Sequence, residues 1–469
     1  MSDFITRYPY QFDEREKPYY DQYAAACLAV NERGPIDVQA LVSGTLPEGT
    51  PGVGPVIHLT DELVAYFNGK YNPFDPLYND AAYAKAAGFD GVPAIMTIAA
   101  YDDAYLMPIP HEARDVMLVA GLNHSVTSHR PIYAGDTLYL VVNERRWKDV
   151  TPESGSDYRT IAMTYSGEIY NQRGELTNSV VFRVRENLKT YKPECRPAEF
   201  APWEGPAWGR REDHKYTDED WQKICEIWEK EYVRGDEPLY YEDVSVGDEP
   251  AWTLDGPIDD TVEPIPFWGC GLGGSRTLKR EILDPAVRAN MKRNPYDGIY
   301  RLEKRSMSYP AWPDSVRLWD KEFQPHNPLD CTSFAENDDP MCVPPERAML
   351  INYVSRDFAI RHFTNWMGDR GYLKNISWGI MPNETMHHYG YDLPPQEDAV
   401  DFLEMFPDKH GKCLHHPMER DVLIVKSRVY EKHIVCGEPL VEFGWWVEDI
   451  LGNMMEEGRA TVRLPLREK

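Results

Sequence analysis

The chain has 469 residues, 42 % of them hydrophobic, and a formal net charge of −27 at pH 7. This length exceeds what one ordinary hydrophobic core organises, so the sequence predicts two or more domains. The negative charge argues against nucleic acid as a partner, because phosphates would be repelled, and against an anionic membrane surface. No apolar run is long enough to span a membrane, and MSDFITRYPY lacks the layout of a signal peptide. We therefore expect a cytoplasmic protein.

The cysteines and histidines give no pattern typical of a metal centre. The eight cysteines form no CxxC pair, which favours reduced thiols over a disulfide framework. The histidine pairs His387–His388 and His415–His416 lack further ligands at suitable spacing. Gly271–Gly274 lacks the strand and helix that flank a dinucleotide-binding loop. The sequence therefore predicts neither a metal nor a redox cofactor.

The chain opens on a segment rich in tyrosine and charge, with a predicted helix over Tyr19–Glu32. Asp37–His58 contains many glycines and prolines, which limits it to short strands near Val38–Val42 and Val56–Leu59. These residues carry no predicted site.

The next stretch, 60–101, presents polar groups beside an apolar segment. Thr60 is suited to cap a helix that ends at Gly69, and the prolines in Tyr71–Pro76 exclude regular structure there. A short helix is predicted over Asp80–Ala87, followed by a buried helix over Pro93–Tyr101.

A change of period then predicts β-structure. Five segments alternate polar and apolar residues or run apolar, with β-branched and aromatic side chains: Met117–Ala120, Asn123–His129, Asp136–Arg146, Arg159–Asn171 and Leu176–Arg185. Tyr170–Glu175 is predicted to form a hairpin turn. A proline-rich linker follows at 193–210, and then a helix over Thr217–Tyr232.

The second half of the chain repeats features of the first. We align Val435–Leu440 with Tyr133–Leu138, and Val447–Gly452 with Glu168–Gly174. Two copies of one pattern of strands and turns predict an internal pseudo-dimer.

Other segments of the second half are less regular. Cys270–Pro345 is too long for an ordinary connection and indicates an insertion. A helix is predicted over Tyr353–Phe363 and a closing strand over Arg459–Pro465.

Several motifs resemble those of the MaoC-like dehydratases, the (R)-specific enoyl-CoA hydratase group. Gly69, Asn72, Pro73 and Tyr83–Phe89 match the hydratase motif of that family. Tyr240–Glu249 resembles the opening of many MaoC-like domains, and Thr364–Leu373 resembles a segment of one subgroup. We place Thr364–Leu373 where the hydratase motif lies in the first half.

The resemblance implies an α+β double hotdog, in which each of two antiparallel sheets wraps around a long central helix. We assign 1–192 to the N-terminal hotdog domain, 193–236 to the linker and connecting helix, and 237–469 to the C-terminal domain. The insertion in the last domain covers about 270–345. A homodimer is expected.

The same resemblance implies a hydro-lyase that adds or removes water across the α,β bond of an acyl-CoA, with coenzyme A only as part of the substrate. Such chemistry requires a base, an acid and donors that hold the thioester oxygen. Lys70 stands where the family has its catalytic aspartate, and Asp75 stands where it has its catalytic histidine.

Three residues are therefore the candidate catalytic groups. Asp75 is the first choice, and its alternative is an Asx turn before Pro76. Lys70 is suited to act as an acid, a thioester-oxygen donor or a counter-ion, against an ordinary salt bridge. Asp369 is the corresponding carboxylate of the second half, against a turn residue at a helix end.

Four further residues are predicted to contact substrate: Asn72, Tyr71, His124 and Arg370. Asn72 is equally suited to fix the turn, and His124 to be a satisfied half-buried histidine. Two other functions stay open at this point. One is elimination or hydration on an unusual molecule, possibly aromatic or not a thioester, and the other is a non-catalytic acyl-binding or subunit-partner protein.

Overall fold

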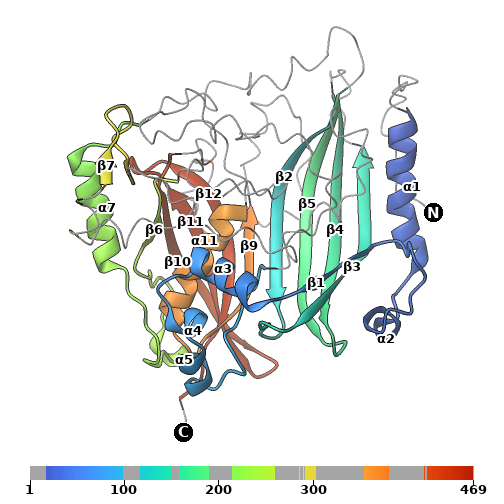
Figure 1. Cartoon of the computed structure of the whole chain (residues 1–469), viewed down its shortest axis with the longest axis horizontal. Coiled ribbons are helices and arrows are strands. Elements are labelled where there is room, and N and C mark those ends of the chain that lie inside the picture. The colour runs from blue at the N-terminus through green and yellow to red at the C-terminus, as the bar shows by residue number, and fades with distance from the viewer. Residues whose placement is uncertain are drawn as a thin grey trace.

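A computed structural model of the chain describes residues 17–98, 117–149, 158–189, 214–258, 291–302, 353–379 and 420–467, together with 285, 289 and 417. Ten of its strands form one antiparallel sheet in the order β1-β3-β4-β5-β2-β9-β12-β11-β10-β6 (Figure 1). The strands of the first half are β1 (Val53–His58), β2 (Met117–Ser128), β3 (Thr137–Asp149), β4 (Tyr158–Asn171) and β5 (Leu176–Lys189). Those of the second half are β6 (Thr253–Asp255), β9 (Tyr372–Gly379), β10 (Leu423–Val435), β11 (Glu438–Glu448) and β12 (Met454–Arg463).

The two halves of this sheet have the same topology. Read from the outer edge inward, the first half runs β1-β3-β4-β5-β2 and the second runs β6-β10-β11-β12-β9. The inner strands β2 and β9 pair with each other, so that Val126 lies opposite Ile376. The internal repeat predicted from the sequence is confirmed, and the halves share one continuous sheet.

One of the two predicted alignments within the repeat is wrong. Val435–Leu440 contains the turn of the β10–β11 hairpin, whereas Tyr133–Leu138 leads into β3, the counterpart of β10. The two segments are therefore displaced by one strand, because both have a glycine followed by an acidic residue but at different turns. The other alignment is correct, since the turns at 171–175 and 449–453 join β4 to β5 and β11 to β12.

Helix α11 (Tyr353–Met367) belongs to the second half. It packs on β9 and β10, and its Phe358 and Phe363 side chains are fully buried. The corresponding helix predicted over Pro93–Tyr101 is wrong for its described part. Pro93 forms a β-bridge with Tyr133 and residues 96–98 form a turn, while 99–101 lie outside the described residues.

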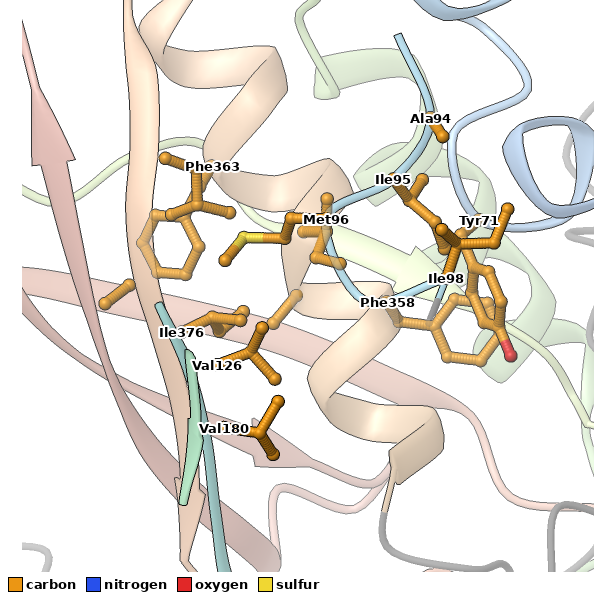
Figure 2. Close-up of a cluster of buried hydrophobic side chains, with 14 of the residues drawn as sticks. Tyr71, Ala94, Ile95, Met96, Ile98, Val126, Val180, Phe358, Phe363 and Ile376 are labelled. Carbon is orange, nitrogen blue, oxygen red and sulfur yellow. The ribbon is translucent and has the colours of Figure 1, made fainter. Parts of the chain in front are cut away.

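The turn at 96–98 nevertheless fills the core that the two halves share. Figure 2 shows Met96 pointing toward Phe363 of α11, with Val126 and Ile376 of the paired inner strands close by. Tyr71 lies beside Phe358, with their ring centroids 5.4 Å apart. The first half therefore inserts apolar side chains against α11 of the second.

Three short helices connect β1 to this turn: α3 (Asp61–Tyr71), α4 (Pro76–Asn79) and α5 (Ala81–Ala86). The predicted cap Thr60 is confirmed, because its hydroxyl accepts the Leu63 N–H at 3.2 Å. The prediction that Gly69 ends the helix is wrong: α3 continues through Gly69 and ends just before Pro73, whose ring cannot extend it. Helix α3 contacts α11, and α4 and α5 follow below it in Figure 1.

The helix predicted near the N-terminus is confirmed as α1 (Lys17–Arg33), which packs on β3. The strand predicted over Val38–Val42 is wrong, because Asp37 accepts the Gln39 and Ala40 N–H groups and starts helix α2 there.

Helix α7 (Asp218–Lys230) has the predicted cap Thr217 in a reciprocal capping box with Asp220. It packs on the second half through Trp228, whose indole N–H donates to the Leu254 carbonyl at 2.9 Å. Most of the predicted insertion lies outside the described residues, which include there the hairpin of β7 (Met291–Arg293) and β8 (Tyr300–Leu302).

Gly458 lies in a tightly packed part of the second half. A Cβ at this position would collide with the Trp445 ring and the Ser377 carbonyl. We expect Gly458→Ala to lower the free energy of unfolding by about 1–3 kcal/mol, measured by urea denaturation. Gly69→Ala is the matched control, because its Cβ would meet nothing within 4 Å and alanine is the better helix former. Equal stability of the two variants would contradict this account of the packing.

Candidate functional site

Asn68 holds the predicted hydratase motif together. Its amide Nδ2 donates to the Tyr78 and Pro93 carbonyls, both at 2.8 Å, and its Oδ1 accepts the Ile95 N–H at 3.1 Å. One fully buried side chain thus joins α3, α4 and the turn that enters the core. The sequence analysis missed this residue, because a single asparagine on an amphipathic helix is usually a surface residue.

Asp75 lies at the start of α4, 3 % exposed. Its Oδ1 accepts the Leu77 N–H at 2.9 Å, which is the Asx turn considered as the alternative reading. The Asn79 amide fixes the loop from Asn72 to Asp75 by donating to the carbonyls of these two residues, at 2.7 and 2.9 Å. The turn is therefore rigid, and one carboxylate oxygen is used to build it.

Asp369 comes from the turn between α11 and β9 of the second half. Its Oδ2 accepts the Tyr83 hydroxyl at 2.8 Å, and its backbone N–H donates to the Gly235 carbonyl at 2.8 Å. Gly368 has φ +66°, and a Cβ there would lie 2.7 Å from the Gly235 carbonyl oxygen. The close approach to Gly235 of the connecting segment therefore fixes the backbone of Asp369, and the hydrogen bond from Tyr83 joins its carboxylate to the first half.

A second contact between the halves lies beside it. The Asn72 amide donates to the Thr364 hydroxyl of α11 at 2.8 Å, and both side chains are buried. Asn72 also hydrogen-bonds to the Asp75 carboxylate. Residues from both halves thus form one cluster around the two aspartates.

The two aspartates affect each other electrostatically. Burial raises the pKa of Asp75 to about 6, and the negative charge of Asp369 contributes to the increase, against hydrogen bonds from Leu77 and Asn72. Burial also raises the pKa of Asp369, with a contribution from the charge of Asp236. A carboxyl group with a pKa of about 6, such as that of Asp75, is suited to proton transfer near neutral pH.

Two tyrosines keep their protons in this cluster. Burial and the hydrogen bond to Asp369 raise the pKa of Tyr83 to about 12. Burial, with the charge of Asp75, raises the pKa of Tyr78 even further. Both phenols are therefore neutral hydrogen-bond donors. Neither tyrosine was predicted to belong to the site. The available signal for Tyr83 was its position in Tyr83–Phe89, the segment that matches the hydratase motif.

The other predicted site residues lie in different surroundings. Tyr71 is 2 % exposed and packs between Phe67 and Phe358, so its ring belongs to the core. Arg370 is exposed beside Asp369. The Lys70 side chain lies outside the described residues, and so its predicted role stays a prediction.

His124 is fully buried in β2 and packs edge-on against Phe182, with ring centroids 4.9 Å apart. The end of β2 near Asp369 is marked by Ser128, whose hydroxyl lies 2.5 Å from the hydroxyl of Tyr372. His124 is four residues before Ser128 in the same strand. At about 3.3 Å per residue, His124 is roughly 13 Å along the strand from that end of β2. His124 is thus more deeply buried than the half-buried histidine that the sequence analysis gave as the alternative, and its contact with substrate stays a prediction.

Thr364–Leu373 lies between β6 and β9, as the hydratase motif lies between their counterparts β1 and β2, but its position relative to the neighbouring elements differs. The segment follows α11 and precedes β9, whereas the hydratase motif follows β1 and precedes the turn at 96–98. Thr364 and Asp369 contact the motif in space, through Asn72 and Tyr83. The two segments are therefore partners in one site and not symmetric counterparts.

In the part of the chain that the structure describes, no group of three or more His, Cys, Asp or Glu side chains is placed to hold a metal ion. Within the same residues, no helix combines the length and apolar character needed to cross a membrane.

Residues 56–179 match the family model of the FAS1-like dehydratase domain region. This region belongs to the MaoC-like dehydratases. The match covers the hydratase motif, with Asp75 and Tyr83, and continues through β2, β3 and β4 into β5. The dehydratase region therefore includes the first-half residues of the cluster and excludes Asp369.

Solved structures similar to this chain have low sequence identity. One named "MaoC-like dehydratase" has a TM-score of 0.42 and 12 % identity, over 88 % of this chain and 96 % of the other. A Mycobacterium tuberculosis protein named as a double hotdog fold has a TM-score of 0.40 and 12 % identity, over 92 % and 99 %. The (R)-hydratase of A. caviae has a TM-score of 0.22 and 20 % identity, over 28 % and 89 %. No curated protein sequence gives a significant match.

Proposed function

We propose that the protein is a hydro-lyase that adds or removes water across the α,β bond of an acyl thioester, with acyl-CoA as its substrate. The observation that carries this proposal is the pair of hydrogen bonds, Asn72 to Thr364 and Tyr83 to Asp369, that join the dehydratase region with Asp75 to the second half. In this proposal Asp75, whose pKa is raised, takes the part of the catalytic histidine of the family.

In the proposed reaction Asp75 does the proton transfer. During hydration its carboxylate takes a proton from water as the oxygen bonds to the β carbon, and the protonated carboxyl then gives that proton to the α carbon. Dehydration is the reverse: Asp75 removes the α proton and returns it to the departing hydroxyl. A carboxyl with a pKa of about 6 is suited to both steps near neutral pH.

Asp369 and Tyr83 influence the protonation of Asp75 in this proposal. The negative charge of Asp369 raises the pKa of Asp75, and the Tyr83 hydroxyl fixes the orientation of Asp369. Because these groups come from both halves, we place the substrate between the halves, in the double hotdog arrangement with a pseudo-dimeric site. Pairing of two chains and a cytoplasmic location stay predictions.

The direct test is turnover of a panel of 2-enoyl-CoA esters by the full chain, followed by the absorbance of the conjugated thioester. Loss of that absorbance with formation of the 3-hydroxyacyl-CoA supports the proposal. Absence of turnover across chain lengths, in both directions, would overturn it.

The pH dependence tests the pairing of the two carboxyl groups. The active form of Asp75 is the carboxylate, so kcat/KM is expected to rise with pH through about 6. Asp369→Asn removes the neighbouring negative charge, so the pKa of Asp75 falls and this acidic limb shifts to lower pH. An unchanged acidic limb in an active Asp369→Asn variant would show that Asp369 does not act on the base.

A second function, non-catalytic acyl binding, is favoured by one observation. The Oδ1 atom of Asp75 accepts the Leu77 N–H and so has a structural role that needs no chemistry. Stabilisation by acyl-CoA without turnover would identify this function. An aromatic substrate would suit the aromatic side chains of the predicted insertion, such as Tyr300. The structure places the Tyr300 ring edge-on against Trp221, with ring centroids 4.9 Å apart.

A further inference from the structure

The segment after α7, which the sequence analysis assigned to the connection between the domains, reaches the turn that contains Asp369. The Arg234 N–H donates to the Asn365 carbonyl at 3.0 Å, and the Arg234 Nε donates to the Trp366 carbonyl at 2.6 Å. The next residue, Gly235, accepts the Asp369 N–H at 2.8 Å. The last carbonyls of a helix have no partners within the helix, so these bonds fix the end of α11 and the turn that follows it.

Gly235 also lies against the hydratase motif of the first half. A Cβ at this position would lie 3.2 Å from the Tyr83 hydroxyl oxygen, and beyond its chain neighbours it would meet no other atom of the described structure within 4 Å. Ordinary contacts of a Cβ begin near 3.4 Å, so the hydroxyl or the segment would have to move by a few tenths of an ångström. The same hydroxyl donates to the Asp369 carboxylate at 2.8 Å. The absence of a side chain at Gly235 thus leaves the hydroxyl in place for this hydrogen bond.

Three carboxylates from different elements act on the Tyr83 hydroxyl: Asp369, to which it donates, Asp236 of the connecting segment and Asp75 at the start of α4. Burial raises the pKa of Asp369, and the charge of Asp236 raises it further, whereas the hydrogen bond from Tyr83 lowers it. Loss of this hydrogen bond would therefore favour the neutral form of Asp369. The negative charge that contributes to the raised pKa of Asp75 would then diminish.

We propose that Gly235 is a positioning residue of the site. Its carbonyl holds the Asp369 backbone, and its lack of a side chain leaves the space in which the Tyr83 hydroxyl reaches the Asp369 carboxylate. The connecting segment is thus a third component of the site, beside the hydratase motif and the end of α11. The effect of Gly235 on turnover rests on the proposed function, whereas its effect on stability does not.

Gly235→Ala is expected to lower kcat/KM for a 2-enoyl-CoA ester roughly tenfold, because a small displacement of positioned groups has an effect of this order on the rate. The acidic limb of the pH profile should also shift to lower pH, as expected for Asp369→Asn, since the displaced hydroxyl no longer stabilises the Asp369 charge. A general loss of folded protein would lower the rate without moving this limb.

A double-mutant cycle with Tyr83→Phe isolates the contact, because phenylalanine lacks only the hydroxyl that a Cβ at Gly235 would meet. In the Tyr83→Phe background, Gly235→Ala should have no further effect on kcat/KM or on the pH profile. The midpoint of urea denaturation gives the same cycle without turnover. Gly235→Ala should lower this midpoint when the Tyr83 hydroxyl is present, and should lower it less when the hydroxyl is absent.

The matched control is Gly44→Ala. Gly44 has φ +69° and Gly235 has φ +58°, so alanine meets similar backbone strain at both, but a Cβ at Gly44 would have nothing within 4 Å. The control should leave the acidic limb unchanged. The proposal is overturned if both variants lower the denaturation midpoint equally, or if Tyr83→Phe does not reduce the effect of Gly235→Ala. Absence of turnover in every variant would overturn the proposed function alone, because the denaturation cycle still tests the contact.

Discussion

Asp75→Asn is expected to reduce the turnover of a 2-enoyl-CoA substrate roughly 10²- to 10⁴-fold, because asparagine transfers no proton and general acid–base catalysis contributes a factor of this size. The fold should be retained, since the asparagine Oδ1 can still accept the Leu77 N–H that starts α4. Steady-state rates with purified variants, at a pH above 6, measure the effect.

The same substitution has a predictable effect on stability. Burial raises the pKa of Asp75 in the folded state, so its ionised form is unfavourable there, and this cost is present as pH rises through about 6. Asp75→Asn removes the cost, so its melting temperature at neutral pH should be no lower than that of the unchanged protein. A functional carboxylate that lowers stability would explain both results.

Asp80→Asn is the matched control for this experiment. Asp80 caps the next helix, α5, accepting the Ala82 and Tyr83 N–H groups at 2.8 and 3.1 Å, but it is exposed. It should leave kcat and KM unchanged. Full activity of Asp75→Asn, or an equal loss in both variants, would show that Asp75 acts as a helix cap and not as a base.

Arg361→Leu is expected to lower the free energy of unfolding by about 3–5 kcal/mol. Arg361 lies in α11 with no exposed side-chain surface and forms ion pairs with Glu231 at 2.9 Å and Asp255 at 2.8 Å, both also buried. Leucine fills much of the same space but leaves two buried carboxylates without their cation. Urea denaturation, monitored by tryptophan fluorescence, measures the difference.

Arg173→Leu provides the comparison. Its ion pair with Glu175, at 2.7 Å, is on an exposed hairpin turn where solvent screens the charges, and such pairs contribute at most about 1 kcal/mol. One outcome would contradict this expectation: Arg361→Leu lowers the free energy of unfolding no more than Arg173→Leu does. In that case the ion pairs of Arg361 with Glu231 and Asp255 do not hold α11 to β6 and to the segment after α7.

The sequence alone predicted those helices and strands that are determined by residues adjacent in the chain. Alternating side chains predicted β2 to β5, and cap residues such as Thr60 and Thr217 predicted where helices begin. The resemblance in the hydratase motif indicated the family and singled out Asp75. A local prediction failed where a side chain hydrogen-bonds to nearby backbone. The Asp37 carboxylate accepts the Gln39 and Ala40 N–H groups, and so a helix begins where a strand was predicted.

Only the tertiary structure decided how the two halves cooperate. The sequence suggested one carboxylate in each half, but it placed Asp369 in a symmetric copy of the motif. The structure instead brings the end of α11 against the motif, so that Tyr83 bonds Asp369 across 286 positions of the chain. Spacing along a sequence describes nearest neighbours, whereas this contact exists because β2 pairs with β9 and α11 packs against α3.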